Sequence, residues 1–172
     1  DVVVGIAASG RTPYVKGALH YAREIQAGTI SLSCNENAEI SRIASVAIEA
    51  VVGPEILTGS TRLKAATAQK MILNMLSTAV MVKSGKVFGN LMVDLKPTNQ
   101  KLVERAKNII QKATGVTKEE AGKYLELAGN RVKIAILMAK TKADASTAEH
   151  YITQAEGSIR QAVFNFEGCK QS

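Results

Sequence analysis

The sequence predicts an α/β protein in which a doubly wound parallel sheet is followed by a small all-helical C-terminal domain. Three observations support this class. Residues 2–6 form a continuous, mostly β-branched run that is typical of an interior parallel strand. Strand and helix patterns then alternate in the order β-α-β-α-β, which favours a parallel sheet. After Gly53-Pro54 the spacing of hydrophobic residues becomes mainly helical.

The first helix is predicted over Pro13–Gln26. Thr12 is a suitable N-cap, and Pro13 suits the first turn because its fixed φ matches the helix and it has no N–H to leave unpaired. Apolar residues between Val15 and Ile25 recur at helical spacing, so this helix has one face for burial against the sheet.

Three shorter elements complete the α/β part. Thr29–Cys34 is predicted to be the second strand, Ala38–Ala44 a short helix, and Val46–Ala50 the third strand. Ligands of parallel α/β sheets bind at the carboxyl ends of the strands. The loops that follow these strands are therefore the first places to search for a site.

The rest of the chain is predicted to be helical. A long helix is expected over Gly59–Val82, and Thr117 with Glu120 predicts a capping box at the start of a later helix. We assign residues 1–90 to the α/β domain and residues 91–172 to the helical domain. No internal repeat is evident. The later helices are expected over residues 98–113, 117–128, 131–142 and 144–164.

The composition is that of a globular protein with excess positive charge. The 172 residues have a net charge of +7, with 46% hydrophobic and 4% aromatic residues. Few aromatic side chains are available to stack on bases, and the basic tail also carries acids, so we expect no nucleic-acid partner and keep binding of DNA or RNA by this tail only as a third, weaker hypothesis. The longest apolar run, residues 71–82, is too short to span a membrane, so we expect no membrane partner.

Met71 and Met75 lie at helical spacing within this run and are expected in a helix core.

The cysteines and the first residue suggest a cellular compartment and a missing segment. Cys34 and Cys169 lie far apart with no histidine cluster near them, which excludes a structural zinc site and fits a reducing cytoplasm. The chain opens at Asp1, without an initiator methionine or a signal-peptide pattern, directly before a buried-type strand. Such a strand normally needs neighbours on both sides. We therefore expect upstream structure to be missing.

The first candidate site is the turn between the first strand and its helix. Unpaired backbone N–H groups and the dipole at a helix start attract an anion. Gly10 allows close backbone approach, Ser9 and Thr12 supply hydroxyls, and Arg11 supplies charge. Together these residues describe a phosphate cradle. The alternative is an ordinary strand-to-helix turn that is capped by Thr12.

The second candidate site is the stretch Gly53–Lys64, another loop that leads into a helix start. Basic residues near a helix N-terminus oppose the dipole, and such conflicts are expected at functional sites. Glu55 is the only acid in this stretch. Four roles stay open for Glu55: binding a sugar hydroxyl, pairing with Arg62 or Lys64, acid–base catalysis, and capping at the surface. The hydroxyl-bearing and basic residues of the second half of the loop are Ser60, Thr61, Arg62 and Lys64.

Other conspicuous residues carry weaker signals. His20 and His150 lie within helical patterns without a partner at useful spacing, so both are expected on the surface. Cys34 ends a strand and is expected to be a small buried side chain. Asn35 and Asn37 follow it at the ligand-facing end of the sheet.

Several segments resemble the bacterial N-acetylmuramic acid 6-phosphate etherase family. Residues 2–15 are similar to one motif of that family. Residues 53–70 resemble its signature, which is shared with the glucokinase regulatory protein. Residues 74–78 and 89–94 also fit. The resemblance covers nearly the whole chain.

The resemblance implies a sugar isomerase (SIS) type sheet followed by a small helical domain. Family members cleave the D-lactyl ether of N-acetylmuramic acid 6-phosphate, giving N-acetylglucosamine 6-phosphate and D-lactate in cell-wall recycling and amino sugar catabolism. The resemblance implies no metal and no organic cofactor. A base removes the proton at sugar C2, lactate leaves from C3, and water adds, so a carboxylate suits the acid–base role.

The same resemblance assigns roles to the two candidate sites. Ser9, Gly10 and Thr12 match a phosphate-binding loop, and residues 60–64 match the second signature near the substrate. The family's acid–base glutamates lie in a segment before Asp1, so we expect none of the catalytic residues here, with Glu55 a weak candidate. We expect a cytoplasmic homodimeric lyase. The alternative is a non-catalytic, sugar-phosphate-binding SIS regulatory protein.

Overall fold

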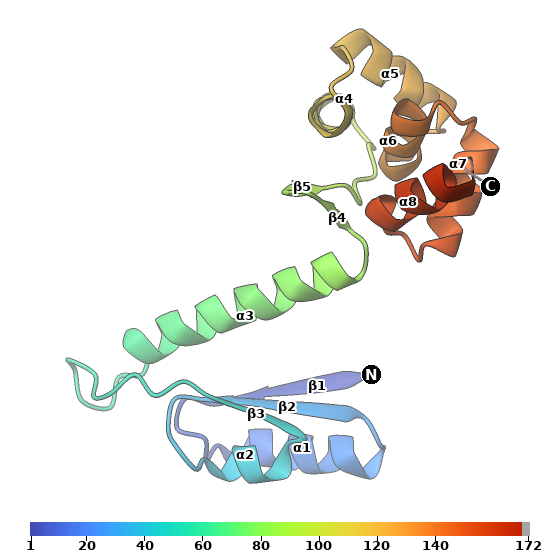
Figure 1. Cartoon of the computed structure of the whole chain (residues 1–172). Coiled ribbons are helices and arrows are strands. Elements are labelled where there is room, and N and C mark those ends of the chain that lie inside the picture. Colours follow the sequence, from blue (N-terminus) through green and yellow to red (C-terminus); the bar gives the residue numbers. More distant parts are fainter. Residues whose placement is uncertain (170–172) are drawn as a thin grey trace. The chain divides into compact units, whose positions relative to one another are not determined.

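A computed structural model of the chain describes residues 1–169 (Figure 1). The chain forms two compact units, Asp1–Ser77 and Thr78–Ser172. The division between them falls within the long helix α3 (Lys64–Lys83).

The first unit is built on a three-stranded parallel sheet. Its strands β1 (Val2–Ile6), β2 (Gly28–Ser33) and β3 (Val46–Glu49) lie in the order β1-β2-β3. The register pairs the first residue of β1 with Gly28 and the first residue of β3 with Ile30. The predicted α/β class is confirmed, and β2 and β3 each lie within one residue of their predicted ends.

Two helices cover one face of this sheet (Figure 1). They are α1 (Pro13–Glu24) and α2 (Glu39–Ile43), both close to their predicted positions. Gly5 of β1 lies directly beneath α1, because a Cβ atom there would stand 2.8 Å from Leu19 Cδ1. This close approach lets Leu19 and Ile40 be completely buried between the helices and the sheet.

Strand β1 was predicted to be an interior strand, but it pairs only with β2 among the described strands. Its alternate residues Val2, Val4 and Ile6 are 63%, 38% and 38% exposed, and Val46 at the start of β3 is 54% exposed. The face of the sheet opposite α1 and α2 therefore carries exposed apolar side chains in the first unit.

Helix α3 begins at Lys64 rather than at the predicted Gly59. Gly59 has a left-handed φ of 83°, and the Ser60 N–H donates to the Leu57 carbonyl at 3.0 Å in a turn, so residues 59–63 do not continue the helix. The prediction that Met71 and Met75 lie in the core is wrong for the described chain, since they are 55% and 62% exposed. Met71 and Met75 follow the helical spacing that the sequence shows, but no described element covers them.

The second unit opens with a short hairpin that the sequence analysis missed. Strands β4 (Val87–Phe88) and β5 (Leu91–Met92) pair antiparallel. Two residues per strand are too few to show the alternating pattern that identifies a strand. The hairpin packs through Phe88 and Leu91 against the helical core that follows.

Five helices form the rest of the second unit. Helix α6 packs against each of the other four and is buried along almost its whole length. The single helix predicted over residues 144–164 is wrong, because Glu156 and Gly157 have φ values of 50° and 85° and break it into two. No helix among residues 1–169 is long and apolar enough to cross a membrane. The helices are α4 (Gln100–Thr114), α5 (Lys118–Leu127), α6 (Val132–Thr141), α7 (Ala145–Gln154) and α8 (Ile159–Cys169).

The helical unit contains an internal repeat, which corrects the expectation that none is present. Residues 114–140 align without a gap with residues 141–167, each position matching the one 27 residues later. The first copy supplies α5 and α6, and the second supplies α7 and α8. Only five positions are identical, so residue types alone hide the repeat. The identical pairs are Thr114/Thr141, Ala121/Ala148, Tyr124/Tyr151, Ala128/Ala155 and Ala135/Ala162.

The two copies share their caps and turns. Thr117 and Asp144 are the N-caps of α5 and α7, and each side chain accepts from the backbone N–H three residues later. Glu120 completes the predicted capping box, which is confirmed. Thr114 and Thr141 each donate from Oγ1 to the carbonyl four residues earlier, at 2.7 Å in both cases. Left-handed residues recur at 115 and 142, at 129 and 156, and at 130 and 157.

Candidate functional site

The turn after β1 is held in one conformation by backbone contacts. Gly10 has a φ of 69°, its N–H donates to the Ala7 carbonyl at 2.9 Å, and its own carbonyl accepts from the Ile40 N–H at 3.1 Å. Thr12 occupies the N-cap position of α1, but its side chain makes no capping hydrogen bond in the described chain. The Thr12 hydroxyl therefore does not cap the turn, in contrast to the alternative considered above. The first N–H groups of α1 receive no hydrogen-bond acceptor from the Thr12 side chain.

An open hollow lies beside this turn, and we call it the Ser9 hollow. Its volume is about 390 Å³, and it sits where β1 and β2 end, at the carboxyl edge of the sheet. Ligands of parallel α/β sheets occupy this edge. The Ser9 hollow contains two of the predicted phosphate-binding residues, while Thr12 stands next to it in sequence. The lining residues are Ser9, Arg11, Asn35, Glu36, Asn37, Ala38 and Glu39.

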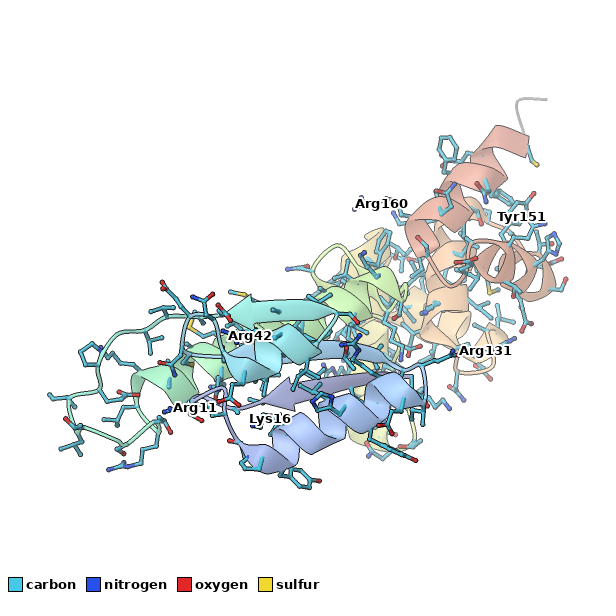
Figure 2. All side chains as sticks on the ribbon, turned by 90° about the horizontal axis from the view of Figure 1, so that it is seen from below. Arg11, Lys16, Arg42, Arg131, Tyr151 and Arg160 are labelled. Carbon is cyan, nitrogen blue, oxygen red and sulfur yellow. The ribbon has the colours of Figure 1, made fainter. Side chains whose placement is uncertain are left out.

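The charges around the Ser9 hollow are of both signs. Lys16 Nζ lies 2.7 Å from Glu39 Oε2, and this hydrogen bond and the Lys16 charge, with a smaller contribution from Arg11, lower the pKa of Glu39. Glu39 is thus an ionised partner of Lys16. Arg11 forms no ion pair with any carboxylate of residues 1–169, so its charge remains available to an anion. Figure 2 labels Arg11 and Lys16.

Glu49 is a residue of this edge that the sequence analysis missed. Its carboxylate accepts from the backbone N–H groups of Asn37 at 2.9 Å and Ala38 at 3.0 Å. The nearby Ser41 hydroxyl and these two N–H donors lower the pKa of Glu49, which is therefore ionised at neutral pH. Glu49 fixes the loop that forms one wall of the Ser9 hollow. An acid at the end of a predicted parallel strand is the signal that would have found it.

Hydrogen bonds join the β2–α2 loop to the turn after β1. The backbone N–H of Cys34 and the side-chain Nδ2 of Asn35 both donate to the Ala8 carbonyl, at 3.0 and 2.9 Å. The two loops that line the Ser9 hollow are therefore joined by hydrogen bonds at the sheet edge.

Glu55 caps the start of α3. Its Oε2 accepts from the Lys64 N–H and its Oε1 from the Ala65 N–H, both at 3.0 Å. These two backbone donors, and then the Lys64 charge, lower the pKa of Glu55. Both carboxylate oxygens thus accept hydrogen bonds from the backbone. Of the roles that the sequence left open for Glu55, this arrangement corresponds to capping.

Cys34 brings the start of α3 to the same edge of the sheet. It is buried as predicted, and its Sγ donates to the Ala65 carbonyl at 3.8 Å. Burial, and then the negative charge of Glu55, raise the pKa of the Cys34 thiol. The second candidate loop therefore begins its helix beside the end of β2.

The structure does not gather all predicted site residues into one hollow. None of the residues of the second loop lines the Ser9 hollow. Ser60 is half-buried, and Thr61, Arg62 and Lys64 are exposed near the start of α3. His20 and His150 are exposed, as predicted.

We predict that Glu55→Gln lowers the thermal stability of the first unit at pH 7 and weakens its dependence on pH. A carboxylate with a lowered pKa stabilises the folded state above its unfolded-state pKa, and this stabilisation is lost as pH falls through the folded-state value. The difference in melting temperature between wild type and variant should therefore be present at pH 7 and shrink below about pH 4.5, the ordinary value of this carboxyl group. Melting curves between pH 3 and 7 measure it.

Glu36→Gln is the matched control, because Glu36 is an exposed glutamate of the same edge that makes no ion pair among residues 1–169. Its melting difference from wild type should stay small at every pH. Equal behaviour of the two variants would contradict the capping role of Glu55.

Comparison with known proteins identifies a domain of the chain. Residues 1–79 match the model of the SIS domain. Residues 1–79 form a SIS domain. Residues 89–128 match the C-terminal lid domain of glucokinase regulatory protein. The SIS-type domain expected from the sequence motifs is thus confirmed.

Relatives of this SIS-domain chain carry an enzyme name. It is 58% identical over 167 residues to N-acetylmuramic acid 6-phosphate etherase 1 of Bacillus licheniformis, covering 97% of this chain and 55% of that protein. It is 60% identical over 161 residues to N-acetylmuramic acid 6-phosphate etherase of Oceanobacillus iheyensis, covering 94% and 55% respectively. A Clostridium botulinum etherase is 55% identical, covering 96% and 55%. The chain spans about half the length of these curated relatives.

Proposed function

We propose that this chain acts in an N-acetylmuramic acid 6-phosphate etherase, a carbon–oxygen lyase that releases D-lactate and N-acetylglucosamine 6-phosphate in cell-wall recycling. The observation that carries the proposal is the 58% identity to a named etherase across 97% of the chain. At such identity, the turn and loop residues that shape a substrate site are expected to serve the same chemistry.

The Ser9 hollow is proposed to hold the phosphate of the sugar. Its position at the carboxyl edge of the sheet, the unpaired charge of Arg11 and the Thr12 hydroxyl, which is not engaged as a cap, support this role. Gly10 fixes the turn that carries Ser9 and Arg11. Residues 60–64, at the start of α3, are proposed to contact the rest of the substrate.

The acid–base chemistry is proposed to come from residues outside this chain. Elimination needs a base at C2 and an acid for the departing lactate oxygen. The two glutamates at the described sheet edge that hold backbone N–H groups, Glu49 and Glu55, have lowered pKa values, which makes each a weak base. We assign both to positioning loops rather than to proton transfer.

The proposal includes assembly, location and domain limits. We propose that the protein is a cytoplasmic homodimer, in keeping with free Cys34 and Cys169 and with SIS-type sites built between subunits. We also propose residue 90 as the functional limit between the SIS domain and the helical domain.

A lactate-release assay tests the proposed reaction. The complete gene product that contains this chain is incubated with N-acetylmuramic acid 6-phosphate, and D-lactate is measured with D-lactate dehydrogenase. Ser9→Ala is expected to raise KM by roughly tenfold, because a hydrogen bond to a charged phosphate is lost. Ser146→Ala, an exposed serine of α7, is the control and should leave KM unchanged.

The assay separates the etherase from a sugar-phosphate-binding regulator. The regulator remains the second candidate because Glu49 and Glu55 are committed to backbone N–H groups and Glu39 to Lys16. Binding of the sugar phosphate without D-lactate release by the complete protein would favour the regulator and contradict the etherase.

A further inference from the structure

The internal repeat of the helical unit places two basic residues at equivalent positions. Lys133 is the second residue of α6, and Arg160 is the second residue of α8, 27 positions later. Lys133 Nζ lies 3.7 Å from Asp94 Oδ1, and its side chain is 17% exposed. The same position of the second copy has no such partner, because Arg160 forms no ion pair with any carboxylate of residues 1–169. The repeat thus contains one neutralised cation and one free cation.

Arg160, labelled in Figure 2, borders a hollow of about 270 Å³ that we call the Arg160 hollow. A second cation lies in its wall: Lys140, at the end of α6. Lys140 Nζ stands 5.4 Å from the centre of the Phe88 ring and pairs with no carboxylate of the described chain. The lining residues are Phe88, Gly89, Lys140, Arg160 and Val163.

The charged side chains that line the Arg160 hollow are all positive. Two cations face a shared space whose lining contains no acid, so their mutual repulsion is uncompensated by the lining. A guanidinium group presents a planar fork that fits the two oxygens of a carboxylate or the oxygens of a phosphate. Phe88 and Val163 offer an aromatic ring and an aliphatic surface beside these charges. Gly89 adds no side chain to the rim.

We propose that the Arg160 hollow binds a small organic anion, with its carboxylate or phosphate oxygens on Arg160 and Lys140 and its apolar part against Phe88 and Val163. The volume is at the small end for ligand sites, which limits the ligand to a compact molecule. All five lining residues belong to the second unit, so this site is separate from the Ser9 hollow and does not depend on the proposed etherase activity.

Anion titrations of the 172-residue chain test the proposal. The probes are phenyl phosphate, benzoate, inorganic phosphate and acetate at constant ionic strength, followed by calorimetry and by the ring resonances of Phe88. Phenyl phosphate or benzoate should bind and shift these resonances. Each should bind at least tenfold more tightly than the matching anion without a ring. Comparison of the two aromatic probes distinguishes a phosphate ligand from a carboxylate ligand.

Two variants and one control make the test specific. Arg160→Gln and Lys140→Gln should each weaken the tighter aromatic probe at least tenfold while the melting temperature stays near that of wild type. Lys101→Gln, an exposed lysine of α4 that makes no ion pair among residues 1–169, should leave binding unchanged. Unchanged affinity in Arg160→Gln, an equal loss in Lys101→Gln, or no shift of Phe88 with any probe would overturn the proposal.

Discussion

Substituting alanine for Gly10 is expected to destabilise the first unit by about 2–4 kcal/mol and to abolish the proposed phosphate binding at the Ser9 hollow. Gly10 has a φ of 69°, and a Cβ atom there would lie 2.3 Å from Ala38 Cβ and 3.3 Å from Ala38 Cα. Left-handed strain and the steric clash both oppose the change. The loop that carries Ala38 is itself held by Glu49, so it cannot retreat without losing two hydrogen bonds.

Hydrogen exchange of the β1 and β2 amides in rising urea measures this loss in the first unit alone. Gly17→Ala is the matched control, since Gly17 lies in α1 with nothing within 4 Å of the added Cβ. It should stabilise the unit by about 0.5–1 kcal/mol, because alanine is the better helix former. Stability of Gly10→Ala equal to that of Gly17→Ala would contradict the steric argument.

Alanine at Gly85 is expected to have a comparable effect on the second unit, a loss of about 2–4 kcal/mol. The φ of Gly85 is 64°, and a Cβ there would stand 2.7 Å from Gly157 C, 2.8 Å from Gly157 O and 2.9 Å from Ser158 N. These are backbone atoms of the turn between α7 and α8, which cannot rotate away as a side chain would. Alanine at position 85 therefore pushes residues 84–85 away from the turn at Gly157 and Ser158, which belongs to the second copy of the repeat.

Gly129→Ala is the matched control that separates the backbone strain from the steric clash. Gly129 also has a left-handed φ, of 59°, but a Cβ atom there would meet nothing within 4 Å. It should therefore show the strain of about 1–2 kcal/mol without the clash. Urea unfolding, with exchange of the α6 and α8 amides as the readout, compares the two variants. A Gly85→Ala variant no less stable than Gly129→Ala would show that the turn yields at little cost.

The alternating part of the fold was the most predictable from sequence. The β-branched strands and the helix that starts at Pro13 have distinct hydrophobic periods, and each lies close to its predicted position. The capping box of Thr117 and Glu120 depends on residues three apart, so it too can be read locally. The candidate site at residues 9–12 can be predicted for the same reason, since its residues are adjacent in the chain.

Features that depend on contacts between residues distant in the chain could not be predicted from the sequence pattern. Glu49 acts on Asn37 and Ala38, which no local pattern connects to it. Glu55 reaches the start of α3 across nine residues, so its capping role stayed one of several alternatives. The break before α8 needed Glu156, a non-glycine residue, in a left-handed conformation.

Because α6 packs against α4, α5, α7 and α8, it belongs to the contacts of both copies of the repeat. If α6 unfolds, α5 loses its partner within the first copy, and α7 and α8 lose the helix against which the second copy packs. The five helices therefore gain or lose their order in one cooperative event, with no half-melted array in which one hairpin outlives the other.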